Sequence, residues 1–223
     1  MFSLKTYRCC GCGKVFYRDA AQYVYNSSCI CKTCSAALPC TTGKRRFFGD
    51  YYNDYTYSPF YYEGLYRSIF LSFKFHGDLS FGHILGMAAG DELKGIDELC
   101  GYDTVVPVPL SKERSNERGY NQSEIMAGYI ADALGIPLCN YLTRIKNGPP
   151  QSTAVGVERT NVLLGAFIAS GDAAGKRIIL FDDIHTTGST LHECELTLRN
   201  AGARDVCPVT AAYVYRGSGN NIY

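Results

Sequence analysis

Residues 177–190, RIILFDDIHTTGST, constrain the fold of this chain more than any other stretch. A continuous apolar run ends in two adjacent aspartates, Asp182 and Asp183, and a tract of hydroxyl side chains and glycine follows. A strand that is apolar at every position predicts burial on both faces, as in a parallel sheet covered by helices. When such a strand leads into a helix through a short loop, the loop lies at the carboxyl edge, where open α/β sheets bind ligands. The stretch therefore predicts an α/β fold with a ligand site at its end.

Strand and helix patterns alternate along most of the chain. Short apolar strands are expected at 103–109, 166–169 and 206–215, and helices with apolar residues every three to four positions are expected at 63–75, 79–93, 121–134 and 191–201. Asn121 with Glu124, and Thr190 with Glu193, have the spacing of capping pairs at helix starts. This alternation predicts a doubly wound, mostly parallel sheet.

Composition excludes several classes of protein. The chain has 223 residues, of which 46% are hydrophobic and 19% charged, which is typical of a globular protein and not of a disordered one. A formal net charge of +1 gives no overall attraction to nucleic acid or to a membrane surface. The first residues lack the apolar core of a signal peptide, and no apolar run is long enough for a membrane helix. We expect a cytoplasmic protein without membrane insertion.

The cysteines predict a small metal-binding module. Seven of the eleven cysteines lie within residues 9–40, and four of them form two C-x-x-C pairs separated by eighteen residues, within the range of a Cys₄ zinc ribbon. The alternative is a set of reduced structural cysteines or a disulfide pair. The expected Zn²⁺ ligands are Cys9, Cys12, Cys31 and Cys34, and the cysteines that can replace one of them are Cys10, Cys29 and Cys40.

Three regions follow from these patterns. Residues 1–42 are expected to form the zinc-ribbon-like module, and residues 63–223 the α/β domain. Residues 43–62 between them are polar and aromatic with little helical period, which indicates an aromatic linker or hairpin.

The tract after the aspartates has the composition of an anion-binding loop. Glycine lets the backbone approach a ligand closely, and free N–H groups at a helix start together with hydroxyls suit a phosphate dianion. The loop has no lysine and lacks the spacing of a Walker-type loop, which favours a sugar monophosphate. The two carboxylates can accept hydrogen bonds from vicinal ribose hydroxyls, directly or through Mg²⁺. Taken singly, the aspartates can also merely end a strand, and the hydroxyls can merely cap a helix. The expected phosphate-binding residues are Thr186, Thr187, Gly188, Ser189 and Thr190.

The stretch IILFDDIHTTGST resembles the phosphoribosyl pyrophosphate (PRPP) motif of type I phosphoribosyltransferases. The wider chain resembles the ComF family of competence-associated, phosphoribosyltransferase-like proteins. That resemblance runs in order through CGCG…CKTC, LYRSIFLSFKFHGD, VVPVPLSKERSNERGYNQSEIMAGYIA, PPQS…ERTN and the PRPP motif. It implies a type I phosphoribosyltransferase fold with an N-terminal zinc ribbon, and it implies PRPP with Mg²⁺ as ligands.

In type I enzymes a nucleophile, usually a base nitrogen, replaces pyrophosphate at ribose C1. The resemblance implies that Asp182 and Asp183 hold the ribose hydroxyls and Mg²⁺ as the catalytic pair, and that residues 186–190 hold the 5′-phosphate. It identifies no acceptor. The pyrophosphate is expected at the turn after strand 103–109, although the mixed charges there are also typical of a solvated loop. The residues that match this turn are Leu110, Ser111, Lys112, Arg114 and Arg118.

Other residues match the family signature without a role that the sequence defines. Residues 143–161 are polar and without period, and they correspond to a loop that closes over substrate in related enzymes; a plain surface loop is the alternative. Lys74 and His76 also match, with a solvated helix end as the simplest interpretation. The signature residues are Asn121, Gln122, Arg144, Gln151 and Arg159, and Lys146 is a further candidate for the closing loop.

Two functions remain open at this stage. One is a PRPP-dependent transferase, and the other is a binding module for single-stranded DNA or a DNA-uptake helicase. The second is favoured by a tyrosine-rich stretch, which follows three cations at 44–46, because bases stack on aromatic rings while cations contact phosphates. The alternative is a hairpin that packs the ribbon against the main domain. The tyrosines are Tyr51, Tyr52, Tyr55, Tyr57, Tyr61, Tyr62 and Tyr66.

Overall fold

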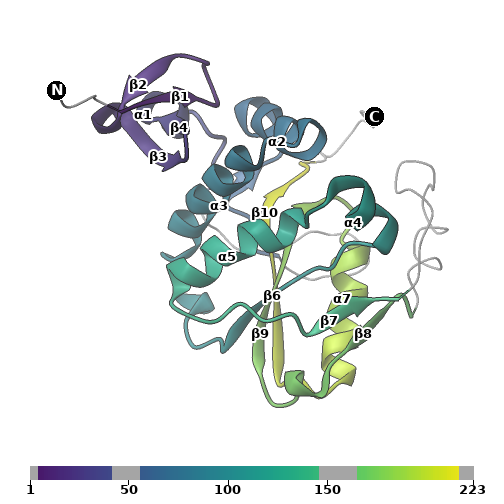
Figure 1. Ribbon diagram of the computed structural model, residues 1–223. Coiled ribbons are helices and arrows are strands. Elements are labelled where there is room, and N and C mark those ends of the chain that lie inside the picture. The colour runs from purple at the N-terminus through teal and green to yellow at the C-terminus, as the bar shows by residue number, and fades with distance from the viewer. Residues whose placement is uncertain (1–4, 42–55, 146–164, 216–223) are drawn as a thin grey trace.

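A four-stranded parallel sheet forms the centre of the main domain in a computed structural model that describes residues 5–41, 56–145 and 165–215 (Figure 1). The strand order is β5-β10-β9-β6, and each neighbouring pair is parallel. The strands are β5 (Phe60–Tyr61), β6 (Thr104–Pro107), β9 (Arg177–His185) and β10 (Asp205–Tyr213). The predicted parallel α/β sheet is confirmed.

The central strand β9 is buried on both faces, as its apolar run predicts. Ile178 and Leu180 pack into one apolar cluster, whereas Ile179 and Phe181 pack into another on the opposite face. The strand is longer than the apolar run, because β10 supplies backbone partners as far as the pair of Tyr213 with His185. The two aspartates therefore lie within β9 and not at its end.

Helices cover both faces of the sheet (Figure 1). One face packs against three helices, and the other packs against one helix and a two-stranded antiparallel sheet. The first group is α2 (Gly64–His76), α3 (Leu79–Leu93) and α5 (Gln122–Leu134). The second group is α7 (Ser189–Asn200), β7 (Leu142–Arg144) and β8 (Phe167–Ala169). Three short 3₁₀ turns complete the described elements: η1 (Arg18–Ala20), η2 (Asp97–Leu99) and η3 (Gly171–Ala173).

Three segments differ from their sequence-based assignment. Residues 112–118 form helix α4 (Lys112–Arg118) and not a loop, because the Ser111 hydroxyl caps its start and Gly119 ends it in the left-handed conformation (φ 73°). Phe60–Tyr61, expected in a linker or hairpin, pairs with β10 as an edge strand of the main sheet. At the start of α7 the cap position is Gly188 and not Thr190, so the expected pairing of Thr190 with Glu193 is wrong.

Helices α3 and α5 pack unusually closely through glycines. A Cβ atom added at Gly90 would lie 2.9 Å from the Tyr129 carbonyl oxygen, and one at Gly86 would lie 3.2 Å from the Met126 Cα atom. These positions have no room for a side chain, so the backbones of the two helices approach to the limit set by van der Waals contact.

The cysteine-rich module is a four-stranded sheet of order β2-β1-β4-β3 that packs against α3. Its apolar residues, such as Ile30, belong to the same buried cluster as those of α2, α3 and α5. At the contact with α3, the Tyr25 ring stacks on His83 with centroids 3.7 Å apart, and the Tyr23 hydroxyl donates to Asp91 at 2.8 Å. The elements are β1 (Thr6–Cys9), β2 (Val15–Tyr17), β3 (Ala21–Tyr25), β4 (Ser28–Cys31) and α1 (Lys32–Ala36).

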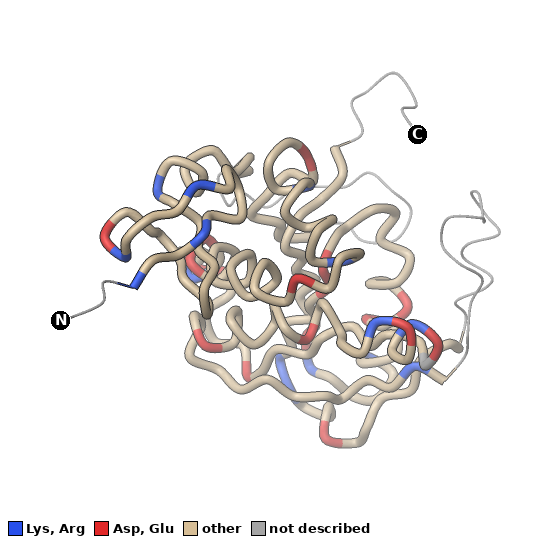
Figure 2. The backbone as a smooth tube through the Cα atoms, turned by 45° about the horizontal axis from the view of Figure 1, so that its top comes forward, with Lys and Arg blue, Asp and Glu red and all other residues tan. Residues whose placement is uncertain are grey.

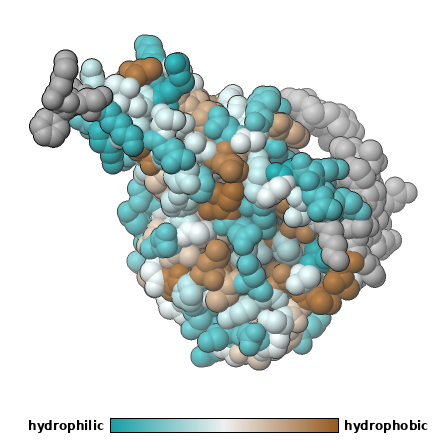
Figure 3. Space-filling model, in the orientation of Figure 1, coloured by the Kyte–Doolittle hydropathy of each residue, from teal (hydrophilic) through white to brown (hydrophobic). Residues whose placement is uncertain are grey.

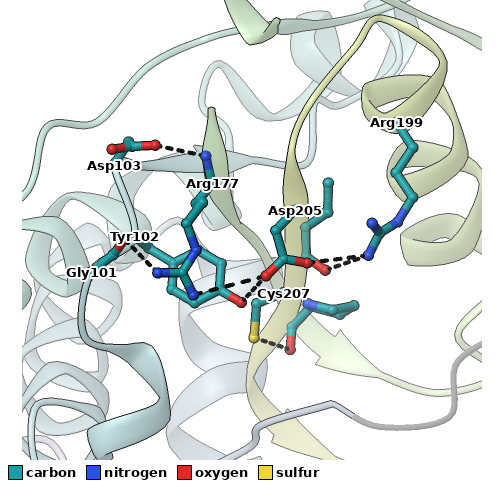
Figure 4. Close-up of polar contacts among 9 residues, drawn as sticks. Gly101, Tyr102, Asp103, Arg177, Arg199, Asp205 and Cys207 are labelled. Atoms are coloured by element: carbon teal, nitrogen blue, oxygen red, sulfur yellow. Dashed lines mark hydrogen bonds and ion pairs between the residues drawn. The ribbon is translucent and has the colours of Figure 1, made fainter. Parts of the chain in front are cut away.

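A polar network closes the amino edge of the main sheet (Figure 4). Asp205 accepts a hydrogen bond from the Tyr102 hydroxyl at 2.8 Å and lies 3.6 Å from the Arg199 guanidinium. Arg177 donates its backbone N–H to Asp103 at 2.7 Å and a guanidinium N–H to the Gly101 carbonyl at 2.9 Å. This edge satisfies its charges internally, which leaves the carboxyl edge for a ligand.

On the face seen in Figure 3, apolar residues lie scattered among hydrophilic ones. No helix in the described ranges is long and apolar enough to cross a membrane.

Candidate functional site

A pocket of about 170 Å³ lies at the carboxyl edge of the sheet, where the pattern of residues 177–190 predicts a ligand site. Both aspartates and the whole hydroxyl-rich tract line it, and so do one residue that follows β5 and one in the last turn of α2. The lining residues are Tyr62, Lys74, Asp182, Asp183, Ile184, His185, Thr186, Thr187, Gly188, Ser189, Thr190 and Leu191.

Asp182 is half-buried, and its hydrogen-bond donors within the described part of the chain are neutral. Its Oδ1 accepts hydrogen bonds from the Ser123 hydroxyl at 2.8 Å and from the Asp183 N–H at 2.9 Å. Desolvation by burial and the neighbouring Asp183 charge raise the Asp182 pKa to about 7, against a smaller opposing effect of these hydrogen bonds and of Lys74. The carboxyl group therefore carries its charge at a cost to the folded protein, which a bound cation or a hydrogen-bond donor would offset.

Asp183 points to the opposite face of β9, because neighbouring side chains of a strand alternate. Its Oδ1 accepts the N–H of Ile184 at 2.7 Å. After desolvation, the Asp183 charge is the largest cause that raises the pKa of Tyr66, and it also raises the pKa of Tyr62. The Tyr66 hydroxyl is buried and has no hydrogen-bond partner among the described residues. The pocket is thus reached by one carboxylate from each face of the strand.

The turn after β9 combines close backbone approach with hydroxyl donors. Gly188 adopts φ 75°, which glycine adopts readily, and no side chain caps the first turn of α7. The first N–H groups of a helix have no partner within it, so they are available to an anion. The Thr187 and Ser189 hydroxyls lie 3.0 Å apart, within hydrogen-bond distance of each other. All five residues of the expected phosphate loop line the pocket.

Lys74 is a pocket residue that the sequence interpretation assigned to a solvated helix end. It is half-buried in the last turn of α2, and its ammonium lies 5.7 Å from the centroid of the Phe70 ring. His76, two residues later, is exposed and does not line the pocket. The motif FKFHGD indicated that a basic residue here could belong to the site. Only the packing of α2 against the sheet shows that this residue is Lys74 and not His76.

Leu110, Ser111, Arg114 and Arg118, which are candidates for the pyrophosphate site, are not among the residues that line this pocket. Leu110 and Ser111 follow β6, and the Ser111 hydroxyl accepts the Arg114 N–H at 3.4 Å. Lys112 begins α4, and Arg118 ends it. The turn is tied to the main sheet because the Val108 N–H donates to the Phe181 carbonyl at 2.8 Å.

The signature residues of α5 lie between this turn and the aspartates. Asn121 caps α5, accepting the Ser123 N–H at 3.1 Å and donating its amide to the Val108 carbonyl at 3.1 Å. Gln122 is buried, and neither end of its side-chain amide has a hydrogen-bond partner among the described residues. A buried amide without partners costs stability, which is the kind of group that a ligand can satisfy.

Arg144 lies on β7, over the Phe167 ring at 5.4 Å. Burial lowers its pKa, and the nearby charge of Arg114 adds to this effect, so these two cations belong to one positively charged region. Lys146, Gln151 and Arg159 lie outside the described residues.

The four cysteines of the two C-x-x-C pairs form a cluster that can hold a metal ion. Their sulfur atoms all lie within 4.8 Å of one another, although β2, η1 and β3 separate the pairs along the chain. The first pair lies at the end of β1, and the second lies at the end of β4 and in α1. The Cys31 N–H donates to the Cys9 sulfur at 3.3 Å, and the Cys34 N–H donates to the Cys31 sulfur at 3.5 Å.

The electrostatics of the cluster favour a thiolate at Cys9. Burial raises the pKa of this thiol, but backbone N–H groups of Cys12, Cys31 and Gly11 outweigh it and lower the pKa to about 7. Four sulfur donors with such N–H···S contacts match the chemistry of a structural zinc site. Of the possible replacements, Cys10 and Cys29 have raised pKa values, first through burial and then through neighbouring thiols, and Cys40 is exposed.

Four tyrosines of the tyrosine-rich stretch lie within the described residues, and two of them are buried and two half-buried. Tyr57 and Tyr66 are buried, and Tyr61 lies 4.9 Å from the Tyr213 ring. Tyr57 and Tyr66 therefore offer no exposed ring on which a base could stack. Tyr51, Tyr52 and Tyr55 and the cations at 44–46 lie outside the described residues.

Comparison with known proteins supports the family assignment. Residues 121–220 match the phosphoribosyl transferase domain. Competence protein ComFC of Streptococcus pneumoniae is 34% identical over 147 residues, which is 66% of this chain and 63% of the relative. Competence protein ComFC of Bacillus subtilis is 36% identical over 143 residues, covering 62% of this chain and 53% of the relative. The chain is therefore similar to competence proteins named ComFC.

The matched part of this chain spans less than two thirds of these relatives, at 63% and 53% of their lengths. Among solved structures, the glutamine PRPP amidotransferase of B. subtilis is similar, with 24% identity, a TM-score of 0.38 and coverage of 56% of this chain and 25% of that one. A likeness at that level carries no inference about function. The domain match and the parallel sheet together give a phosphoribosyltransferase-like domain.

Proposed function

We propose that this protein is a PRPP-dependent phosphoribosyltransferase of the ComF family, which displaces pyrophosphate from PRPP with a nitrogen nucleophile. The observation that supports it most is the pocket at the carboxyl edge, which combines two carboxylates with a hydroxyl-rich turn at the start of α7. A carboxylate pair suits a ribose diol, and the turn suits its 5′-phosphate. Such a site catalyses mainly by positioning the sugar and by stabilising the charge of the departing pyrophosphate.

Each part of the pocket has a separate task in this proposal. Asp182 and Asp183 accept the hydrogen bonds of the ribose hydroxyls, and the turn at 186–190 donates to the phosphate. The carboxylate oxygens are hard donors that fit Mg²⁺, which would supply positive charge next to the pyrophosphate. Ser123 orients Asp182 through their 2.8 Å hydrogen bond.

The remaining assigned residues bind the leaving group or close the site. Arg114 and Arg144, whose charges influence each other, are placed to attract pyrophosphate, and the buried Gln122 amide is placed to donate to it or to the sugar. We assign pyrophosphate binding to Leu110, Ser111, Lys112, Arg114 and Arg118, and completion of the site to the signature residues Asn121, Gln122, Arg144, Gln151 and Arg159.

A binding and turnover assay tests the transferase. The protein with Mg²⁺ is titrated with PRPP by calorimetry, and pyrophosphate release is measured over a panel of bases and amines. We expect PRPP binding, and we expect Asp182→Asn with Asp183→Asn to lower pyrophosphate release by about 100-fold or more. Asp97→Asn, an exposed aspartate far along the chain from the pocket, is the matched control. A wild-type protein without affinity for PRPP would refute the proposal.

We also propose that the four clustered thiols hold one structural Zn²⁺. The ribbon has a small core of its own, so the metal would supply much of its folding free energy. Metal analysis of the purified protein should give one zinc per chain, and Cys9→Ser with Cys12→Ser should remove it. Cys100→Ser, an exposed cysteine outside the cluster, should leave the zinc content unchanged. A zinc-free wild-type protein with an intact ribbon would contradict the assignment.

A second candidate function is a non-catalytic module of the DNA-uptake machinery, which contacts single-stranded DNA or a helicase. The ribbon favours it, because residues 5–41 contain five lysines and arginines and one acid, and these cations are spread over the ribbon (Figure 2). Arg8, Lys14 and Arg18 are exposed beside the exposed Tyr17 ring. If this function holds, neutralising these three cations weakens single-strand binding and its salt dependence, whereas the aspartate variants bind normally.

A further inference from the structure

The lining of the pocket comes in three parts. β9 contributes Asp182 and Asp183, the following turn and the start of α7 contribute residues 186–191, and the third part consists of Tyr62 and Lys74. In the proposed transferase the first two parts hold the ribose hydroxyls and the 5′-phosphate. The third part is then left for the group that becomes attached to ribose C1.

Topology separates this third part from the proposed pyrophosphate site. In the order β5-β10-β9-β6, Tyr62 directly follows β5 on one side of β9, whereas α4 follows β6 on the other side. A displacement at C1 requires the nucleophile and the leaving group on opposite sides of that carbon. If pyrophosphate leaves toward α4, the nucleophile therefore approaches from the side of Tyr62 and Lys74.

Lys74 brings positive charge to this end of the pocket. It is the one lysine or arginine among the described residues that line the pocket. Its ammonium forms no ion pair with a described carboxylate, although its charge lowers the Asp182 pKa, and it lies 5.7 and 5.9 Å from the rings of Phe70 and Phe75. The charge is thus available to a ligand, in a half-buried site where a charged contact is stronger than in water.

Tyr62 supplies a fixed aromatic surface next to that charge. Its N–H donates to the Tyr213 carbonyl at 2.8 Å, and its ring packs edge-on against Phe70 with centroids 5.8 Å apart. The side chain is half-buried and has an exposed part toward the pocket. An aromatic ring held in this way suits a planar ligand, because stacked rings add to the free energy of apolar contact.

From this arrangement we infer that Tyr62 and Lys74 form the acceptor subsite, and that the acceptor is a planar nitrogen heterocycle bearing a carboxylate. The inference rests on the proposed transferase function. In the reaction the ring nitrogen forms a bond to C1 while the C1–O bond to pyrophosphate breaks, and the electron pair of that bond leaves with the pyrophosphate. Any proton on the attacking nitrogen passes to solvent. Lys74 binds the carboxylate, and Tyr62 stacks on the ring.

Product nucleotides test the inference without knowledge of the natural acceptor. Two matched pairs of nucleotides differ chiefly in the carboxylate. One pair is orotidine 5′-monophosphate and uridine 5′-monophosphate, and the other is nicotinic acid mononucleotide and nicotinamide mononucleotide. Titration calorimetry on the full chain should give about tenfold tighter binding for the acid of at least one pair, as expected for one charged hydrogen bond. Lys74→Gln should abolish that preference, and Lys74→Arg should retain it. Lys176→Gln, an exposed lysine outside the pocket, should behave as wild type.

Ribose 5-phosphate separates the acceptor subsite from the rest of the pocket, because it has no heterocycle at C1. Its affinity should be unchanged in Lys74→Gln and in Tyr62→Leu.

Equal affinities within both nucleotide pairs, or no nucleotide binding by a protein that binds PRPP, would overturn the acceptor inference alone. An equal loss of ribose 5-phosphate and nucleotide binding in Lys74→Gln would overturn it as well, since Lys74 would then contact the phosphoribosyl group. A wild-type protein that binds neither PRPP nor ribose 5-phosphate would refute the transferase, and the acceptor subsite with it.

Discussion

The two edges of the same parallel sheet treat their aspartates in opposite ways. At the amino edge, Asp205 contacts a tyrosine hydroxyl and two guanidinium groups, and Asp103 accepts a backbone N–H (Figure 4). At the carboxyl edge, Asp182 and Asp183 repel each other and accept hydrogen bonds only from neutral donors among the described residues. The aspartates of the amino edge stabilise the fold. Those of the carboxyl edge carry negative charge that a bound ligand or cation can stabilise. The same substitution should therefore have opposite effects at the two edges.

The largest difference between substitutions at the two edges should appear in the stabilisation of the protein by added ligand. PRPP with Mg²⁺ at one hundred times its dissociation constant stabilises a binding-competent protein by about 2.7 kcal/mol. We expect this stabilisation in wild type and in Asp205→Asn, and we expect its loss in Asp182→Asn with Asp183→Asn. Thermal unfolding with and without the ligand measures it. A ligand-induced shift that survives the double substitution would mean that the carboxyl edge is not the binding edge.

Without ligand, Asp182→Asn should stabilise the protein at pH 8 by on the order of 2 kcal/mol. The Asp182 pKa is raised from 3.8 to about 7, so its folded state binds a proton that the unfolded chain releases, and stability falls as pH rises between these values. The asparagine retains an oxygen for the Ser123 hydroxyl and removes the charge. The gain should be smallest below about pH 4 and should level off above about pH 7. Urea unfolding at several pH values measures it, and a pH-independent gain would exclude this cause.

At the opposite edge, Asp205→Asn should destabilise the protein by about 1 to 1.5 kcal/mol. The carboxylate links β10 to Tyr102, Arg199 and Arg177, but it is partly exposed, so solvent weakens its ion pairs. High salt should reduce the loss, because screening weakens exposed ion pairs. A stabilising effect in the same unfolding assay would remove the contrast between the two edges.

The smallest contrast involves two tyrosine hydroxyls. Removing each one should change the free energy of unfolding by about 1 kcal/mol, in opposite directions. Tyr66→Phe deletes a buried hydroxyl without a described partner next to the Asp183 charge, and it should stabilise the protein. Tyr102→Phe deletes the hydroxyl that donates to Asp205 at 2.8 Å, and it should destabilise the protein. Denaturant midpoints of the two variants measure the difference. If Tyr66→Phe is the less stable of the two, an unseen partner satisfies its hydroxyl.

Local patterns in the sequence predicted the parts of the structure that depend on neighbouring residues. The apolar run of β9 and the apolar spacing of α2, α3, α5 and α7 indicate these elements because burial imposes a period on the chain. The cysteine spacing is local in the same sense, since each C-x-x-C pair occupies one turn. The four sulfur atoms accordingly meet in the structure.

Elements without an apolar period escaped prediction. Helix α4 is almost wholly charged, and its limits are set by the Ser111 cap and the left-handed Gly119. Strand β5 is short and pairs with β10 on one side and with Cys40 on the other, and no local pattern encodes these partners. The pocket positions of Lys74 and Tyr62 likewise follow from tertiary packing, because α2 contacts β9 only in the folded chain.

Helix α3 determines the spacing between the ribbon and the main domain. Tyr25 and Tyr23 attach the ribbon to one side of it, and the Gly86 and Gly90 contacts seat α5 on the other side without room for even one methyl group. Close packing on both sides of α3 therefore sets the distance between the ribbon and the carboxyl edge of the sheet. A long polymer that contacted both surfaces at once would have to span this one distance. Polymers would then be selected by the distance between their repeating groups as well as by their chemistry.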